Sequence, residues 1–243
     1  MNNQHGIGLP EIMIALLLAS ITMLAMVRHY LNSKEHYHHL QIKLDQSIEL
    51  QLVSDLIRDS SRRAGFTPCL GIEHLTTEDQ RNNHKRLFAT EIGQAGGASV
   101  KMNRMSEYFD TVLQVIGPNE LLTTKNQVVY RDQSILIADC YHAEVQKIGR
   151  IKHNADDQMI TLTQPLAFSY YPPIYVGAWL EETYSIRTQG TLFYHFQHAE
   201  ELTTAVHNLS VYAEQHQGRT LLRVILGLAK GHQLELSTMV RIP

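Results

Sequence analysis

Gly6-Ile7-Gly8-Leu9-Pro10-Glu11 leads directly into a block from Ile12 to Val27 that contains no charged residue. Counted from Ile7 to Val27, the segment is 21 residues long. A helix of that length spans about 30 Å, which is the thickness of a bilayer core. The stretch therefore predicts a membrane-spanning helix at the start of the chain.

Glu11 does not fit a plain membrane anchor. An ionised carboxylate in lipid costs on the order of 2–3 kcal/mol or more unless a cation pairs with it. The first Lys or Arg in the chain is Arg28, 17 positions further on and about 25 Å away along a helix. Cleavage after Gly6 would make Ile7 a new N-terminus, whose ammonium could pair with Glu11 of a neighbouring copy. Pro10 fits this hypothesis, because a helix does not need the missing N–H near its start.

These residues resemble the prepilin motif of type IV pilins and type II secretion pseudopilins. The resemblance implies that a dedicated peptidase cleaves between Gly6 and Ile7 and N-methylates Ile7, and that Glu11 is the carboxylate used in assembly. Residues 1–6 would then be the leader, and 7–64 the pilin helix with 7–28 in the membrane. The leader departs from the family pattern because it lacks Lys and Arg. The alternative is an ordinary secretory signal peptide, which fits poorly without a basic n-region or a small-x-small cleavage site.

Composition limits what the remaining chain can be. Once the anchor is set aside, about 180 residues remain, enough for one domain with a core. The formal net charge of −3 disfavours a broad nucleic-acid-binding surface. The two cysteines, Cys69 and Cys140, form an even set, which in an exported domain favours a disulfide over two separate buried thiols.

The helix is predicted to continue beyond the membrane. Residues 37–63 contain no Gly or Pro, and an apolar residue recurs about every four positions. Arg62-Arg63-Ala64-Gly65 followed by Pro68 predicts the helix end: a basic last turn, a glycine cap and a proline that prevents resumption. The apolar stripe that we expect to pack on a sheet is Leu40, Leu44, Ile48, Leu52 and Leu56, widened by Val53 and Ile57.

The segment 65–243 is predicted to form a β-rich head. Residues 76–106 are interpreted as mostly a surface excursion, because they contain a polar run and a glycine-rich run. Later segments alternate apolar and polar residues, which is typical of strands with one buried face. The expected strands are Thr111–Ile116, Gln127–Tyr130, Ser134–Ala138, Met159–Leu162, Leu192–Phe196, Leu221–Leu228 and Gln233–Ile242. The fold class is thus α+β: a long N-terminal helix whose amphipathic half packs on an antiparallel sheet, as in pilins.

A second resemblance is narrower. Arg63-Ala64-Gly65-Phe66 with Cys69 just beyond, and Asp139-Cys140-Tyr141-His142-Ala143, are similar to segments of the PilW type of minor pilin. That resemblance implies that the two segments hold the two ends of a disulfide. It also suggests a helical step from Glu201-Leu202 to Val211, followed by two closing strands. Residues 70–106 match nothing in this type.

No catalytic or metal-binding pattern stands out. His36 and His39 lie one turn apart on the predicted helix but lack a third ligand, so a solvated cluster is the preferred interpretation. His195 and His198 are interpreted as strand-end residues. Tyr170-Tyr171-Pro172-Pro173 is interpreted as a rigid loop between strands, the alternative being an aromatic patch that faces a ligand. Catalytic motifs are absent from the sequence, and we expect no enzyme activity, cofactor or metal.

The function expected from the resemblance is that of a minor pilin in the initiation or tip complex of a type IV pilus. Its partners would be the prepilin peptidase, the other minor pilins, the major pilin and the assembly platform. It would be a single-pass protein of the bacterial inner membrane with a periplasmic head. The alternatives are a J-like minor pseudopilin of type II secretion and a membrane-anchored exported binding protein. The cysteine pair and the Arg63–Phe66 corner favour the pilus, because pseudopilins of that type do not usually carry both.

Overall fold

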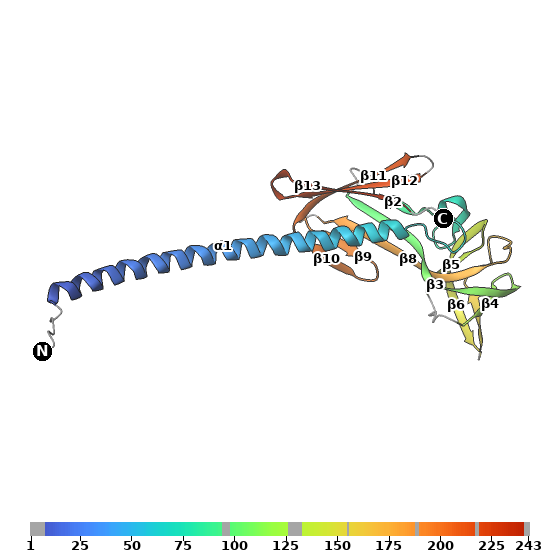
Figure 1. Cartoon of the computed structure of the whole chain (residues 1–243). Helices are drawn as coiled ribbons and strands as arrows, with labels where there is room; N and C mark the ends of the chain where they lie inside the picture. Colours follow the sequence, from blue (N-terminus) through green and yellow to red (C-terminus); the bar gives the residue numbers. More distant parts are fainter. Residues whose placement is uncertain are drawn as a thin grey trace. The chain divides into compact units, whose positions relative to one another are not determined.

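The computed structural model describes residues 8–93, 98–125, 133–154, 156–187, 190–216 and 219–240. It contains one long helix followed by a β-rich head (Figure 1). Contacts divide the chain into one unit up to Gln51 and a second from Leu52 onward. The elements are α1 (Leu9–Arg63), η1 (Ile72–His74), β1 (Thr76–Asp79), β2 (Thr90–Ile92), β3 (Ser99–Gly117), β4 (Glu120–Thr124), β5 (Ser134–Ala138), β6 (His142–His153), β7 (Asp157–Leu162), β8 (Tyr175–Ile186), β9 (Leu192–His195), β10 (Ala199–Thr203), β11 (Val206–His216), β12 (Arg219–Leu228), η2 (Ala229–Gly231) and β13 (Gln233–Met239).

Helix α1 confirms the predicted continuous helix. Its N-terminal part is long and apolar enough to cross a membrane, and none of that span is buried. Pro10 lies in the first turn, where its missing N–H costs nothing. At the other end Gly65 has a φ of 75°, the left-handed conformation that glycine provides at a helix end. The Gly65 N–H then donates to the Asn103 carbonyl on β3 at 2.7 Å, so the helix stops where its backbone joins the sheet.

The predicted packing face of α1 is confirmed only in part: Val53 and Ile57 are buried and Leu56 is half-buried. Leu40, Leu44, Ile48 and Leu52 are exposed, and only the last turns of the helix are buried. The face that is buried runs through Val53, Ser54, Ile57, Ser60 and Ser61, ending at Ala64 just beyond the helix. This face follows the helical period but is rotated from the leucine stripe and contains three serines, so a search for apolar residues finds Val53 and Ile57 but not its serines.

Six strands of the head pair in a closed ring. β3 pairs with β4, β4 with β7, β7 with β6, β6 with β5, β5 with β8, and β8 returns to β3, all antiparallel. The long strand β3 closes the ring because its first part pairs with β8 and its last part with β4. A core cluster comes from these strands and from Ile174, just before β8: Val112, Leu121, Ile135, Ile137, Ile148, Ile160, Leu162, Ile174 and Val176.

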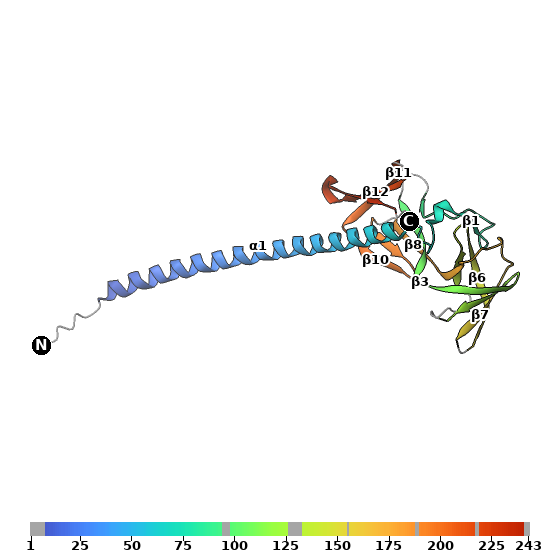
Figure 2. The same ribbon diagram turned by 45° about the vertical axis from the view of Figure 1, so that its right-hand side comes forward.

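The remaining strands extend this ring or form a second sheet. β9 pairs with β8, β10 with β9, and β2 with β3. β1 lies parallel to β6, with Thr76 opposite His142 (Figure 2). β11, β12 and β13 form a separate antiparallel sheet of three strands, and Leu222, Val224 and Leu226 on β12 are buried.

Several strand predictions are confirmed. Ser134–Ala138 has the predicted bounds, and the structure has strands over the other expected segments that it describes: those starting at Thr111, Met159, Leu192, Leu221 and Gln233. Gln127–Tyr130 lies outside the described residues, as does Ile242.

Two predictions in the head are wrong. The helical step over residues 201–211 is instead β10 and β11. The segment 76–106 is not mainly a surface excursion, because it contains β1, β2 and the start of β3. Within it Val100, Met102 and Met105 are fully or almost fully buried.

Candidate functional site

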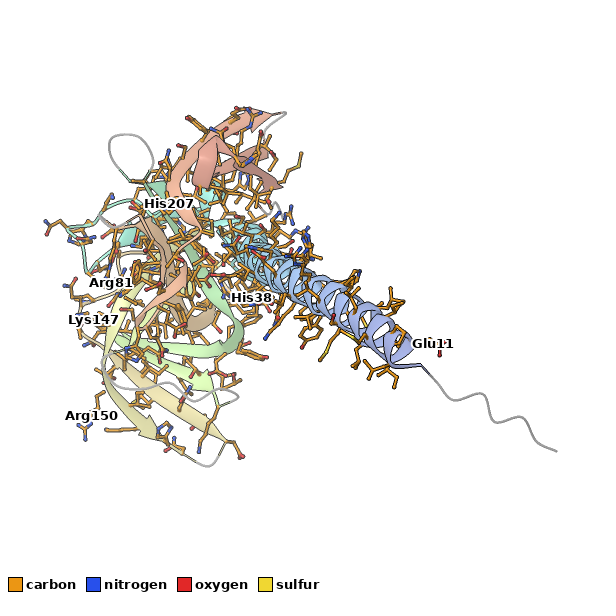
Figure 3. The ribbon with its side chains drawn as sticks, turned by 90° about the vertical axis from the view of Figure 1, so that its left-hand side faces the viewer. Glu11, His38, Arg81, Lys147, Arg150 and His207 are labelled. Carbon is orange, nitrogen blue, oxygen red and sulfur yellow. A yellow bond between two sulfur atoms is a disulfide. The ribbon has the colours of Figure 1, made fainter. Side chains whose placement is uncertain are left out.

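The start of α1 carries the predicted assembly carboxylate. Glu11 lies in the first helical turn and is exposed (Figure 3). Its Oε2 accepts the Gly8 N–H at 3.2 Å, so within one chain the side chain satisfies a backbone donor that the helix leaves free. A carboxylate there is also favoured by the positive end of the helix dipole. Gly6 and Ile7, the predicted cleavage and methylation residues, lie outside the described residues.

The end of α1 is fixed to the head by a buried polar network. The Ser60 hydroxyl hydrogen-bonds to Glu182 Oε2 and lies 2.8 Å from the Tyr184 hydroxyl. Glu182 Oε1 accepts from Arg104 at 2.7 and 3.1 Å. Burial raises the pKa of Tyr184, so its hydroxyl stays protonated. Each charged group has a partner, as buried polar groups require.

The predicted disulfide is present. Cys69 and Cys140 are bonded with their Cα atoms 5.2 Å apart. The bond joins the segment that follows α1 to the turn between β5 and β6. Cross-linking residues separated by 71 positions is worth roughly 4 kcal/mol in the chain-entropy model. The predicted pairing of Cys69 with Cys140 is therefore confirmed.

Asp139, next to Cys140, organises two loops. It is fully buried, and its Oδ1 accepts the N–H groups of Tyr141 and His142 at 2.7 and 2.6 Å. Its Oδ2 accepts the Tyr171 N–H at 2.9 Å. Burial alone would raise the pKa of Asp139, but these backbone hydrogen bonds outweigh it and lower the pKa. One ionised side chain thus holds the β5–β6 turn against the β7–β8 loop.

A second buried carboxylate holds the same β7–β8 loop. Glu144 Oε2 accepts the Ala167 N–H at 2.7 Å, and the amides of Gln80 and Gln146 donate to Glu144 at 3.1 and 2.9 Å. Burial raises the pKa of Glu144 in spite of these donors. The loop is therefore attached to the β5–β6 region at Ala167 and again at Tyr171.

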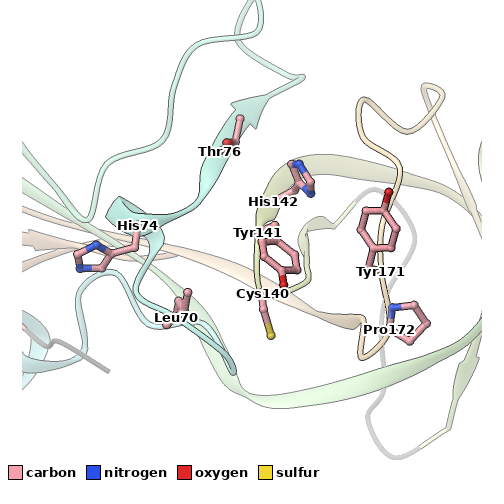
Figure 4. A pocket seen from close by; sticks show the side chains of 8 residues that line it. All are labelled: Leu70, His74, Thr76, Cys140, Tyr141, His142, Tyr171 and Pro172. Carbon is pink, nitrogen blue, oxygen red and sulfur yellow. The ribbon is translucent and has the colours of Figure 1, made fainter.

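These attachments border an open hollow of about 810 Å³ beside the disulfide (Figure 4). Its three sides are the segment with Leu70, His74 and Thr76, the β5–β6 turn with Cys140, Tyr141 and His142, and the β7–β8 loop with Tyr171 and Pro172. The rings of Tyr141 and Tyr171 meet edge to face, with centroids 6.5 Å apart. His142 stacks on Phe168 with centroids 4.9 Å apart.

The structure brings some of the predicted residues together and leaves others apart. Cys140 and Tyr171 line one hollow, so the alternative of an aromatic patch at Tyr170–Pro173 has geometric support. Sequence reasoning missed the hollow, because Leu70, His74 and Thr76 come from the segment without recognisable pattern.

The histidines of α1 show no metal site among the described residues. His39 Nε2 lies 3.9 Å from Glu35 Oε1, one helical turn away. Across the described ranges, no three His, Cys, Asp or Glu side chains are close enough to hold a metal ion.

Comparison with known proteins provides no assignment. No family model matches this chain, and no significant match was found among curated proteins or solved structures.

Proposed function

We propose that this protein is a minor pilin of the PilW type, a structural subunit of the initiation or tip complex of a type IV pilus. The observation that carries the proposal is one continuous helix, α1, which begins with Pro10 and Glu11 and carries an apolar span. The same helix ends at a left-handed Gly65 close to a disulfide-bonded Cys69. These features occur together in the family that the sequence resembles.

In this proposal the chain is anchored in the bacterial inner membrane with a periplasmic head. Prepilin peptidase removes residues 1–6 and methylates Ile7. Glu11 then pairs with the Ile7 ammonium of an adjacent subunit, either another minor pilin or the major pilin, on the assembly platform. Pairing relieves the cost of a lone carboxylate in lipid, and that relief favours assembly.

The N-terminus is the first test. Mass spectrometry of the membrane-bound protein is expected to show Ile7 as the first residue, with one added methyl group on its amine. Detection of intact Met1, or of cleavage beyond Val27, would exclude processing at the prepilin motif.

The second test separates the assembly role of Glu11 from its contact within the chain. Glu11→Gln keeps a side-chain oxygen that can accept the Gly8 N–H but removes the charge, whereas Glu11→Ala removes both. If charge pairing drives assembly, both variants co-purify with less of the other minor pilins than the native protein at equal membrane abundance. Asp45→Asn, an exposed acid on the same helix, is the matched control and should recover partners normally. If Glu11→Gln recovers partners as the native protein does, the carboxylate has no charge-dependent role in assembly.

A further inference from the structure

We propose that the hollow beside the disulfide binds an extended, proline-rich segment of a partner protein. This inference rests on the head alone and does not depend on the pilus assignment. We call this hollow the tyrosine hollow; it is lined by Leu70, His74, Thr76, Cys140, Tyr141, His142, Tyr171 and Pro172.

The tyrosine hollow exposes two large rings on backbone that the head holds in place. Tyr141 is 65% exposed and Tyr171 is 63% exposed, although neither is on a free loop. The backbone N–H of each donates to the fully buried Asp139. The disulfide joins Cys140, next to Tyr141, to the segment that leads to Leu70. Fixing in advance the backbone that carries exposed aromatic rings lowers the entropy cost of binding, which is how preformed sites gain affinity.

The shape of the hollow suits an extended chain. Figure 4 shows Thr76 and His74 on one side and Tyr171 and Pro172 on the other, with Cys140, Tyr141 and His142 between them. The hollow is open to solvent, and its volume of about 810 Å³ lies in the range of sites for ligands of several residues or rings. A polyproline II segment enters such a site at low entropy cost, because it is already extended.

The chemistry of the lining favours proline. Among the described residues that line the hollow, none is an Asp, Glu, Lys or Arg, so the matching ligand is neutral. The polar groups are the hydroxyls of Thr76, Tyr141 and Tyr171 and the imidazoles of His74 and His142, and each can donate a hydrogen bond. A proline-rich segment offers carbonyl acceptors and few N–H donors, together with apolar ring faces that pack on tyrosine.

Two other ligand classes fit less well. A nucleic acid strand would stack on the tyrosines but requires cations along its phosphates, and the lining supplies none. A saccharide presents pairs of hydroxyls that both donate and accept. Carboxylates and carboxamides are the side chains that bind such pairs with two contacts, and the lining lacks these too. The proline-rich peptide is therefore the ligand that the residues select.

The test uses full-length protein in mild detergent and a synthetic ten-residue polyproline peptide, with binding measured by calorimetry. The native protein is expected to bind this peptide and not a Gly-Ser peptide of equal length. Tyr141→Ala and Tyr171→Ala should each weaken binding by about tenfold or more, as truncation of an aromatic anchor does. Tyr108→Ala is the control, because Tyr108 is 72% exposed on β3 and does not line the hollow.

Folding of each variant is checked by its unfolding curve and by the absence of free thiols. Both tyrosines are exposed, so the unfolding curve and the thiol content of each variant should match those of the native protein. No polyproline binding by the native protein would overturn the proposal. So would binding that Tyr141→Ala and Tyr171→Ala leave unchanged. A linear glucose oligosaccharide is tested in parallel, and its binding in place of the peptide would identify a saccharide site instead.

Discussion

Asp139 is the residue on which the geometry of the tyrosine hollow depends, because one side chain accepts three backbone donors from two loops. In Asp139→Asn an amide N–H₂ replaces one of the two acceptor oxygens and faces a donor. We expect the free energy of unfolding at pH 7 to fall by about 1–3 kcal/mol, the usual cost of an unsatisfied buried group. Urea unfolding of the protein in mild detergent measures this. Asp156→Asn, at an exposed position, is the control.

The same substitution predicts a pH dependence. The pKa of Asp139 is lowered in the folded protein, whereas an unfolded Asp titrates near about 3.9. Its stabilising contribution is therefore complete above that value and is lost as the pH falls through the lower, folded pKa. The difference in stability between the native protein and Asp139→Asn should be constant from pH 7 to pH 5 and shrink below about pH 4. A difference that stays constant down to pH 2 would contradict the role of the ionised carboxylate.

Ser60 and Ser61 show how much two adjacent buried hydroxyls can differ. Ser60 bonds across the interface to Glu182 and Tyr184, whereas Ser61 donates to Ile57 O within its own helix at 2.7 Å and contacts Met102 Sδ on β3 at 3.7 Å. Ser60→Ala leaves a buried carboxylate short of a donor, so it should cost about 1–3 kcal/mol of unfolding free energy. Ser61→Ala removes a hydroxyl whose carbonyl partner already belongs to the helix, so it should cost less. Equal losses in urea unfolding would argue against a network that fixes the helix end.

At the scale of elements, Gly65 decides where α1 ends. Its φ is 75°, and a Cβ added there would lie 2.8 Å from Ala89 Cβ. Gly231 has a φ of 78° with nothing within 4 Å of an added Cβ, so it provides a matched comparison. Both alanine variants incur the left-handed strain of roughly 1–2 kcal/mol, and Gly65→Ala adds a clash with a buried residue. We expect Gly65→Ala to lower the unfolding midpoint in urea clearly more than Gly231→Ala. Equal shifts would mean that the clash is relieved at no cost.

The elements that the sequence predicted are those with strong local signals. The bounds of α1 follow from an apolar run, a first-turn proline and a glycine cap, all of which act within a few residues. The disulfide was predictable because the two cysteines allow one intramolecular pair, and the predicted export of the domain favours its formation. The strand Ser134–Ala138 is a short apolar run that is buried except at its first residue, which is a clear signal for a central strand.

The strands that were missed lack a regular alternation of buried apolar and exposed polar residues. In β11 the buried residues Val206, Leu209 and Val211 are spaced three and then two apart, because the pairing with β12 shifts between Val206 and Asn208. A bulge of this kind interrupts the alternation that marks a strand, and the helical step predicted here came from the resemblance. In β1 the buried residue is Asp79, which pairs with Arg81 at 2.9 Å, so the buried position is polar. The tyrosine hollow was missed because its three sides meet only in the folded head.

At the scale of the whole molecule, the chain divides after Gln51, and the buried residues of α1 begin at Val53. Removing residues 1–28 deletes the apolar span and, within the described part of that segment (residues 8–28), no buried side chain. The shortened protein should therefore appear in the soluble fraction, retain the disulfide and unfold in urea at the same midpoint as the full chain in mild detergent.

A second truncation is the matched control. Removing residues 1–57 also deletes Val53 and Ile57, which are 4% and 1% exposed. Losing a large buried aliphatic side chain usually costs about 2–5 kcal/mol, so this form should unfold at clearly lower urea or fail to fold. The two truncations together locate the boundary between anchor and head, because only the second removes packing that the head requires. If the first truncation loses as much stability as the second, residues before Val53 contribute to the head and the division at Gln51 is not a boundary of stability.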